Sequence, residues 1–348
     1  MSIQTELTRL EGLRDDIGAA IREKGGTVPQ SAKLADMPEG VRSIAGGGGK
    51  RTARFVVGTS TAGWTAADCD YLCDGTDDQV EINAAIQALP AGGGEVRILD
   101  GTYMVTSPID IRQPCVKLSG NGASTVIKAS GRQMETLIGI LSDLCVVSGL
   151  MCDGVDGKTA PMYGIICSGN NTVITGTICT NIRESGIYIV KDDNDIINNV
   201  CRADANGIEA KGKGNSISGN ICTNNQAYGI KISGGKNTAA NNVCQGNARS
   251  GIDLNKTANN TIIGNICNDN SSSGIDGFQC SSSLIIGNVC FRGGGLPGDY
   301  TGSQGTISMS PTFGVGGENN LVIGNNCAGK APVINGTGNI IQNNIVTA

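Results

Sequence analysis

The chain has 348 residues, of which 53 are glycine and only 3% are aromatic, and it carries a formal net charge of −5. This composition excludes a core built on aromatic side chains, and the negative charge argues against nucleic acid or an anionic membrane as a partner. The sequence contains no run of 18 apolar residues, so we expect no membrane insertion.

Residues 1–45 are predicted to form a separate helical module for attachment or trimerisation. Five apolar residues follow the a/d spacing of a short coiled coil. They are Ile3, Leu7, Leu10, Ile17 and Ile21. A helix that packs only against its own chain would show the same stripe, so both interpretations stay open. This region is acidic and lacks an apolar segment, so we expect no secretory signal peptide. The Gly-rich residues 46–54 are predicted to be a linker.

Residues 55–95 are predicted to begin a solenoid and to cap its first coil with a helix. An Asp-rich turn over 74–78 precedes an apolar-striped segment from Val80 to Leu89. Carboxylates are favoured at a helix N-terminus, so we expect Asp74, Asp77 and Asp78 to cap this helix. Two strands then follow within 95–105.

The remainder of the chain is repetitive. One marker is a Gly-Ile pair, which recurs at intervals of 21 to 23 residues. Its members are Gly164-Ile165, Gly186-Ile187, Gly207-Ile208, Gly229-Ile230, Gly251-Ile252 and Gly274-Ile275. Cysteine is a second marker with almost the same period, at Cys179, Cys201, Cys222, Cys244, Cys267 and Cys290. Short alternating segments between Gly, Asn and Ser clusters are typical of strands. The period therefore predicts a mostly β fold, a right-handed single-stranded parallel β-helix over 96–348 with about 22 residues per coil.

Stacked coils would place equivalent residues in columns about 4.8 Å apart. The cysteines then form an interior column, and their parallel Cβ directions disfavour disulfides, so we expect free thiols. Such a column also lacks the tetrahedral closure of a zinc site, and Cys69 and Cys73 are expected to be ordinary buried thiols. An Asn two residues before the cysteine predicts a hydrogen-bonded amide ladder at a turn. The ladder comprises Asn199, Asn220, Asn242, Asn265, Asn288 and Asn325.

The period breaks between Cys290 and Cys327. Residues 291–318 are Gly-rich and are predicted to form an extra coil with a projecting loop. This segment contains Tyr300 and Phe313, aromatic residues that could bind a sugar ring.

The start of the solenoid resembles a known family. The run Cys73–Asp78, the following helix, Gly-Gly-Gly-Glu-Val and Asp100-Gly-Thr-Tyr103 resemble the opening of pectate-lyase-like β-helix proteins, which include phage tail spikes and polygalacturonase-type glycosidases. Thr27-Val-Pro and Lys33–Pro38 are similar to leading segments of tail proteins from prophages of Gram-positive bacteria. The resemblance implies a homotrimeric tail spike or tail fibre subunit that binds host cell-surface polysaccharide and joins phage baseplate or tail proteins. It would be assembled in the bacterial cytoplasm and released by lysis as part of the virion tail.

The residue after each Gly-Ile pair is expected to point outward in one exposed column. Its members are Tyr188, Glu209, Lys231, Asp253 and Asp276. Glu209, Asp253 and Asp276 are the candidate catalytic carboxylates of a glycoside hydrolase or polysaccharide lyase. Polar residues outside a solenoid also serve solubility, and that interpretation stays open.

The chain contains no His, which excludes a Ser-His-Asp triad and departs from the polygalacturonase site. The candidate carbohydrate-binding residues are Tyr188, Lys231, Tyr300 and Phe313. We expect no metal and no cofactor. The functional hypotheses are a glycan-binding tail protein, a polysaccharide depolymerase and a structural spacer.

Overall fold

The chain divides into two compact units, Met1–Thr52 and Ala53–Ala348. The computed structural model describes residues 3–23, 27–29, 33, 53–130, 134–155, 161–291, 305–310, 317–328 and 331–346. The first unit contains the helix α1 (Ile3–Glu23). No helix in these ranges is long and apolar enough to cross a membrane.

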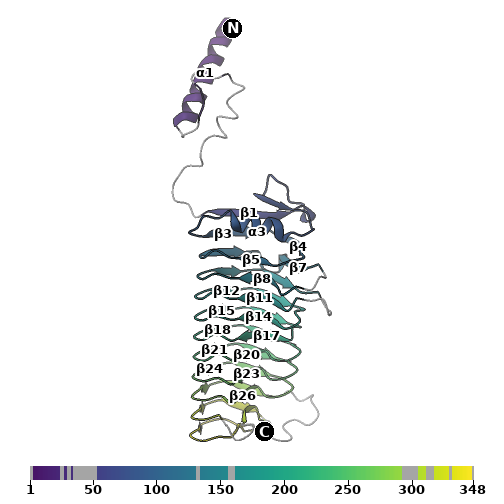
Figure 1. Cartoon of the computed structure of the whole chain (residues 1–348), viewed down its shortest axis with the longest axis vertical. Helices are drawn as coiled ribbons and strands as arrows, with labels where there is room; N and C mark the ends of the chain where they lie inside the picture. The colour runs from purple at the N-terminus through teal and green to yellow at the C-terminus, as the bar shows by residue number, and fades with distance from the viewer. Residues whose placement is uncertain are drawn as a thin grey trace. The chain divides into compact units, whose positions relative to one another are not determined.

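The described strands of the second unit form three parallel sheets, which stack coil upon coil (Figure 1). Sheet A has the order β2 (Tyr71–Cys73), β1 (Arg54–Thr59), β3 (Gly94–Ile98), β6 (Val116–Ser119), β9 (Val146–Ser148), β12 (Val173–Thr175), β15 (Asp195–Ile197), β18 (Ser216–Ser218), β21 (Thr238–Ala240), β24 (Thr261–Ile263), β27 (Leu284–Ile286), β30 (Leu321–Ile323) and β33 (Ile340–Gln342).

Sheet B runs through β4 (Gly101–Val105), β7 (Thr125–Ala129), β10 (Met151–Asp153), β13 (Ile178–Thr180), β16 (Val200–Arg202), β19 (Ile221–Thr223), β22 (Val243–Gln245), β25 (Ile266–Asn268), β28 (Val289–Phe291) and β31 (Asn326–Ala328). Sheet C runs through β5 (Ile109–Ile111), β8 (Thr136–Ile140), β11 (Tyr163–Cys167), β14 (Ser185–Ile189), β17 (Asn206–Ala210), β20 (Ile230–Ile232), β23 (Ile252–Asn255), β26 (Ile275–Phe278), β29 (Ile307–Ser310) and β32 (Val333–Ile334).

From β3 to β32 each coil contributes one strand to each sheet, so the predicted parallel β-helix is confirmed. Inward side chains of the three sheets fill one continuous core of Ile, Val, Leu and Cys. The predicted cysteine column is present: Cys179, Cys201 and Cys222 are in register on neighbouring strands and fully buried. All fourteen cysteines are free thiols. A hydrogen bond with Cys179 and burial both raise the pKa of the Cys152 thiol. The column therefore behaves as a row of small hydrophobic groups.

Buried amide ladders run along the corners between the sheets. In the predicted ladder, the side-chain Oδ1 of Asn220 accepts the backbone N–H of Asn199 at 2.9 Å and its side-chain N–H at 3.0 Å. The pattern repeats through Asn242, Asn265 and Asn288. Thr177 takes the corresponding position one coil earlier, where its backbone N–H and hydroxyl both bond to Asn199.

Two further ladders escaped prediction. One includes Asn194, Asn215, Asn237 and Asn260, and the other Asp204, Asn225, Asn247 and Asn270. Their hydrogen bonds again join one coil to the next. Each corner of the coil thus carries its own polar ladder.

The residue before each member of the predicted ladder has a left-handed backbone. These residues are Asn198, Gly219, Asn241, Gly264, Gly287 and Gly324, with φ between 55° and 66°. Only Gly and Asn adopt this conformation at little cost. The recurring Asn-Asn and Gly-Asn pairs in the sequence therefore indicate where the chain turns from sheet A into sheet B.

The helix α3 (Gln79–Gln87) packs against the strands that start the solenoid. Ile82, Ala85 and Ile86 are buried. Val80, expected on the same apolar stripe, is instead 58% exposed. The helix therefore uses a narrower apolar face than its sequence suggested.

The expected extra coil between Cys290 and Cys327 is wrong. Cys290 pairs directly with Cys327, and the side chain of Asn288 donates to Asn325 at 2.9 Å. This register leaves room for one enlarged coil, whose strand β29 pairs with β26 and β32. Tyr300 and Phe313 lie outside the described residues.

Asp204 is an acidic member of an amide ladder. Its Oδ1 accepts the backbone N–H of Ile182 at 2.9 Å, whereas its buried Oδ2 has no partner among the described residues. Asn247 and Asn270, in the equivalent position, use their side-chain N–H to bond the carbonyls of Cys222 and Cys244. Burial raises the pKa of Asp204 well above its usual value. We infer that Asp204 is protonated in the fold and takes the place of an asparagine.

Asp204→Asn is expected to increase the free energy of unfolding at pH 7 by about 1–3 kcal/mol, because the amide supplies its own N–H donor. The unfolded Asp ionises above about pH 4, so the native protein loses stability as the pH rises from there and the variant does not. Urea unfolding between pH 4 and 8 measures this difference.

The matched control is Asn225→Asp, which should lose stability at pH 7 and recover toward pH 4. An Asp204→Asn variant that is less stable than the native chain at pH 7 would contradict the protonated state.

Candidate functional site

The outer face of sheet C carries the candidate functional residues. The strand register joins Tyr188 to Glu209, Glu209 to Lys231, Lys231 to Asp253 and Asp253 to Asp276. The five residues therefore lie on successive coils, in the predicted order. The same row continues through Asp110, Gly139 and Ile166 before Tyr188 and through Ser308 after Asp276. We call the whole row the sheet C column.

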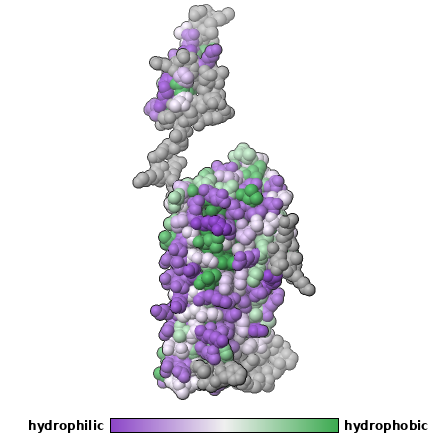
Figure 2. Space-filling model, viewed as in Figure 1, coloured by the Kyte–Doolittle hydropathy of each residue, from purple (hydrophilic) through white to green (hydrophobic). Residues whose placement is uncertain are grey.

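The column is less exposed than expected. Glu209 is 7% exposed and Asp253 is 2% exposed, because side chains of the flanking rows pack over them. The prediction of one fully exposed polar column is wrong for these two carboxylates. The visible face of the β-helix is nevertheless mainly hydrophilic, with small apolar patches toward its N-terminal end (Figure 2).

Glu209 is the centre of a charged cluster. Its Oε1 lies 3.5 Å from the ammonium groups of both Lys211 and Lys231, and the Ser185 hydroxyl lies 3.2 Å from Oε2. Asn206 in turn donates to Ser185 at 3.3 Å. Two cations and a hydroxyl group hold this buried carboxylate in position. These contacts give Glu209 a charge-positioning role.

Asp253 and Asp276 form the second part of the column. Burial and the neighbouring Asp276 raise the pKa of Asp253 to about 7, although Lys231 and Arg249 oppose the shift. Burial also raises the pKa of Asp276. The Oδ2 atom of Asp253 is buried without a hydrogen-bond partner among the described residues. A carboxyl group in this state can hold a proton near neutral pH and donate it as a general acid.

Aromatic and cationic side chains flank the column. The rings of Tyr163 and Tyr188 stack with centroids 4.5 Å apart and an interplanar angle of 15°. The Lys211 ammonium lies 5.7 Å from the Tyr188 ring. Further along, Arg249 lies 5.5 Å from the Tyr228 ring and donates to its hydroxyl at 3.2 Å.

Tyr163 and Tyr228 were missed from the sequence. Both directly precede the glycine of a Gly-Ile pair, so the same period that located the column could have found them. Their position defines a second outward row, beside the one that follows the pair. The missed aromatics make this face richer in ring surfaces than the column alone indicated.

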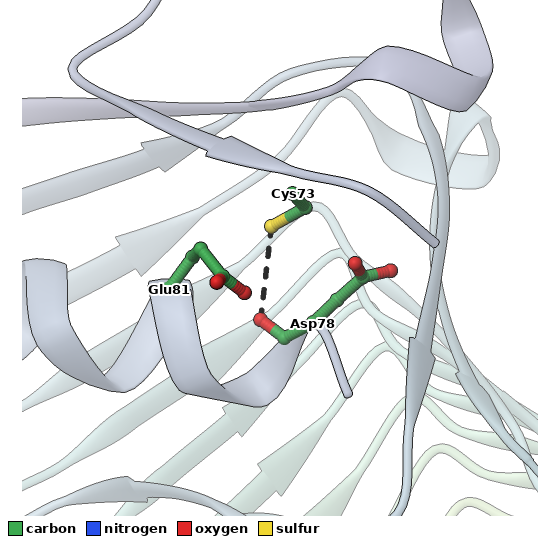
Figure 3. A group of neighbouring side chains, drawn as sticks. All are labelled: Cys73, Asp78 and Glu81. Atoms are coloured by element: carbon green, nitrogen blue, oxygen red, sulfur yellow. Dashed lines mark hydrogen bonds between the residues drawn. The ribbon is translucent and has the colours of Figure 1, made fainter. Parts of the chain in front are cut away.

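A group at the start of the solenoid, Cys73, Asp78 and Glu81, has ligand atoms close enough for a metal ion (Figure 3). The Cys73 thiol donates to the backbone carbonyl of Asp78 at 3.7 Å. Burial raises the pKa of Cys73 and so disfavours the thiolate that a metal requires.

Both carboxylate oxygens of Asp78 are also engaged, by the backbone N–H groups of Gly75 at 2.8 Å and Met104 at 2.7 Å. The expected capping role of Asp78 is therefore wrong in detail: it occupies the N-cap of α3, but its side chain bonds loop and strand amides instead of the helix. These contacts give the group a structural role, joining the capping helix to β4.

Comparison with known proteins supports the fold. Residues 185–346 match a family model described as the right handed beta helix region. The tailspike protein of Dettilon (gp208) is 17% identical, with a TM-score of 0.61 over 78% of this chain and 64% of that one. ORF18 of Geobacillus virus E2 is 14% identical, with a TM-score of 0.59 over 92% and 64%.

The A-module of the mannuronan C-5 epimerase AlgE6 from Azotobacter vinelandii is 21% identical, with a TM-score of 0.56 over 79% of this chain and 93% of that one. The chain spans 64% of the length of each viral chain. A comparison with curated proteins found no significant match. These likenesses define the chain as a right-handed parallel β-helix of the kind found in phage tailspikes, as the sequence predicted.

Asp253→Asn is expected to remove a pH dependence of stability. The native pKa of about 7 lies above the unfolded value near 4, so Asp253 favours the fold at low pH and this contribution disappears as the pH rises through 7. The contribution of Asp253 to the free energy of unfolding is roughly 4 kcal/mol at most, because one pKa unit corresponds to about 1.4 kcal/mol.

Urea unfolding between pH 5 and 8 should therefore show a smaller loss of stability in the variant than in the native chain. Asp195→Asn, on an exposed position of β15, is the matched control and should follow the native curve. If Asp253→Asn also follows the native curve, Asp253 does not titrate near neutrality.

Proposed function

We propose that the chain is a phage or prophage tail spike or tail fibre subunit whose sheet C outer face binds a host surface glycan. The observation that carries this proposal is the continuous row of ring, cationic and carboxyl groups along one rigid face. Aromatic rings and a few placed polar groups are the usual components of a carbohydrate-sized binding surface. The fold shared with a tailspike protein and with a mannuronan epimerase supports the assignment.

Tyr188 and Lys231 are the proposed binding residues of the column. Tyr163 stacks on the Tyr188 ring, and the two rings lie on neighbouring coils. Lys231 remains 27% exposed at its side chain while it neutralises Glu209. A sugar can therefore meet the ring pair and a hydrogen-bond donor on nearby coils. Tyr300 and Phe313, which lie outside the described residues, remain proposed contributors.

A depolymerase is the second candidate function, because Asp253 has the pKa expected of a general acid at neutral pH. Asp253 and Asp276 are on adjacent coils, about 5 Å apart, which is near the carboxyl spacing of retaining glycosidases. Glu209 is two coils from Asp253, about 10 Å away, at the outer limit for inverting enzymes. The 2% exposure of Asp253 restricts substrate access, so binding is the primary proposal.

The unit that contains α1 is proposed to trimerise the chain and attach it to baseplate or tail proteins of the virion. Leu10 and Ile17, two of the predicted a/d residues, are each 40% exposed, whereas Ile21 of the same stripe is buried. Exposed apolar residues at a/d spacing become buried when copies of the helix pack together.

Light scattering should give three times the mass of one 35.5 kDa chain. The mass of a single chain would remove trimerisation from the proposal.

Binding and cleavage are separated by two variants of the full-length protein. Tyr188→Ala is expected to weaken binding to the purified host polysaccharide about tenfold, because stacked ring surface is lost. The double variant Asp253→Asn and Asp276→Asn should bind as the native chain does. If the native chain shortens the polysaccharide, the double variant should be slower by about 10²-fold or more.

Binding is measured by calorimetry and cleavage by size-exclusion chromatography of the polysaccharide. Phe291→Ala, at an exposed ring on sheet B, is the control and should not change binding. Unchanged affinity of Tyr188→Ala would contradict the sheet C surface. If the double variant still cleaves the polysaccharide, Asp253 and Asp276 are not the catalytic pair. If the chain binds no glycan at all, the structural-spacer hypothesis remains.

A further inference from the structure

The sheet C column has one position without a side chain. From Asp110 to Ser308 its members carry side chains except Gly139, which lies between Asp110 and Ile166. A cavity of about 220 Å³ occupies this place. A Cβ atom on residue 139 would lie 2.8 Å from Oδ1 of Asp110, so glycine keeps the cavity open.

The cavity is lined partly by apolar and partly by charged or polar side chains. Pro108, Leu141 and Ile166 line the apolar part. The charged lining residues, which we call the rim, are Asp110, Arg112 and Glu135, and Ser168 and the buried Thr136 complete the lining. A volume of about 220 Å³ is below the usual range for a whole small-molecule ligand, roughly 300–1,000 Å³. It therefore suits a single substituent of a larger molecule that continues along the surface.

The rim offers both donors and acceptors. Arg112 donates one N–H group to Asp110 at 2.6 Å, and its side chain is 70% exposed. A guanidinium has five N–H donors, so others can reach a ligand carbonyl. Glu135 is exposed and offers carboxylate oxygens to a ligand N–H. The neighbouring Leu141 is 42% exposed and offers surface to a methyl group.

We propose that this cavity binds the acetamido group of an N-acetylated amino sugar. The carbonyl would accept from Arg112, the N–H would donate to Glu135, and the methyl group would cover Leu141 and Ile166. The inference rests on the proposed glycan-binding function and specifies the class of sugar. A glycan with a hydroxyl in place of the acetamido group could still donate to Glu135, but it would leave the apolar surface of Leu141 and Ile166 uncovered.

The coil register places the cavity on the same surface as the other groups. Tyr188 is two coils from Gly139, about 10 Å, and Asp253 is five coils away, about 24 Å. One extended glycan can therefore occupy the cavity and contact the stacked tyrosines. At this distance from Asp253 the cavity positions the bound glycan and takes no part in bond cleavage.

The test uses the full-length protein on a printed array of bacterial surface glycans, with and without N-acetylated amino sugars. We expect the bound glycans to carry the acetamido group. Arg112→Ala and Glu135→Ala should weaken their binding about tenfold each, because each variant removes one charge-assisted hydrogen bond. Arg202→Ala, at an exposed arginine on sheet B, should have no effect.

Gly139→Val places a branched side chain in the cavity and should abolish the preference for acetamido groups. Since this change forces Asp110 to move, the two rim variants test the proposal if Gly139→Val fails to fold. Preferential binding of glycans without acetamido groups, or unchanged binding by both rim variants, would overturn the cavity assignment and leave glycan binding intact. Absence of binding to every glycan would overturn the proposed function and the cavity assignment together.

Discussion

The fold depends on hydrogen bonds between asparagine side chains of successive coils. Each buried amide oxygen receives the backbone N–H and, in most steps, the side-chain N–H of the preceding coil, as Asn220 does from Asn199. A buried polar group without its partner costs about 1–3 kcal/mol. A coil that changed its corner-to-corner length would break such bonds along the stack. The ladders therefore help to fix the register of the coils.

The fixed register has consequences outside the core. Residues about 22 apart in the chain become neighbours on the surface, whatever their charges. Asp253 and Asp276 are brought together in this way, and flanking side chains then bury Asp253. The raised pKa of Asp253 follows from burial and from the adjacent carboxyl group. Nearby, the same register brings Lys231 to Glu209, which also contacts Lys211 of its own coil.

Much of this arrangement could be predicted from the sequence, because several residue types recur with the period of the coil. The Gly-Ile and Cys markers predicted the sheets, the interior thiols and the order of the outward column. The Asn ladder two residues before the cysteines was also predicted, and the structure confirms it through Asn220 and Asn242. The ladder through Asn215 has an equally regular spacing, so the same periodicity also indicates it.

Other features depend on packing that no spacing reveals. The burial of Glu209 and Asp253 arises from side chains of neighbouring rows, such as Lys211 and Arg249. The enlarged coil after Cys290 breaks the period, so its register became clear only from the pairing with Cys327. The cavity at Gly139 lies where the coils are longer and where Leu137-Ile138 takes the register position of the Gly-Ile marker.

Hydroxyl-radical footprinting of the full-length protein with a bound host polysaccharide tests the central claim, that sheet C is the glycan-binding face. Oxidation is measured by mass spectrometry at aromatic side chains on different sheets. The account predicts protection of Tyr163, Tyr188 and Tyr228 on the sheet C face and unchanged oxidation of Phe291 on sheet B. Protection of Phe291 with unchanged oxidation of the three tyrosines would place the glycan on another face and contradict the account.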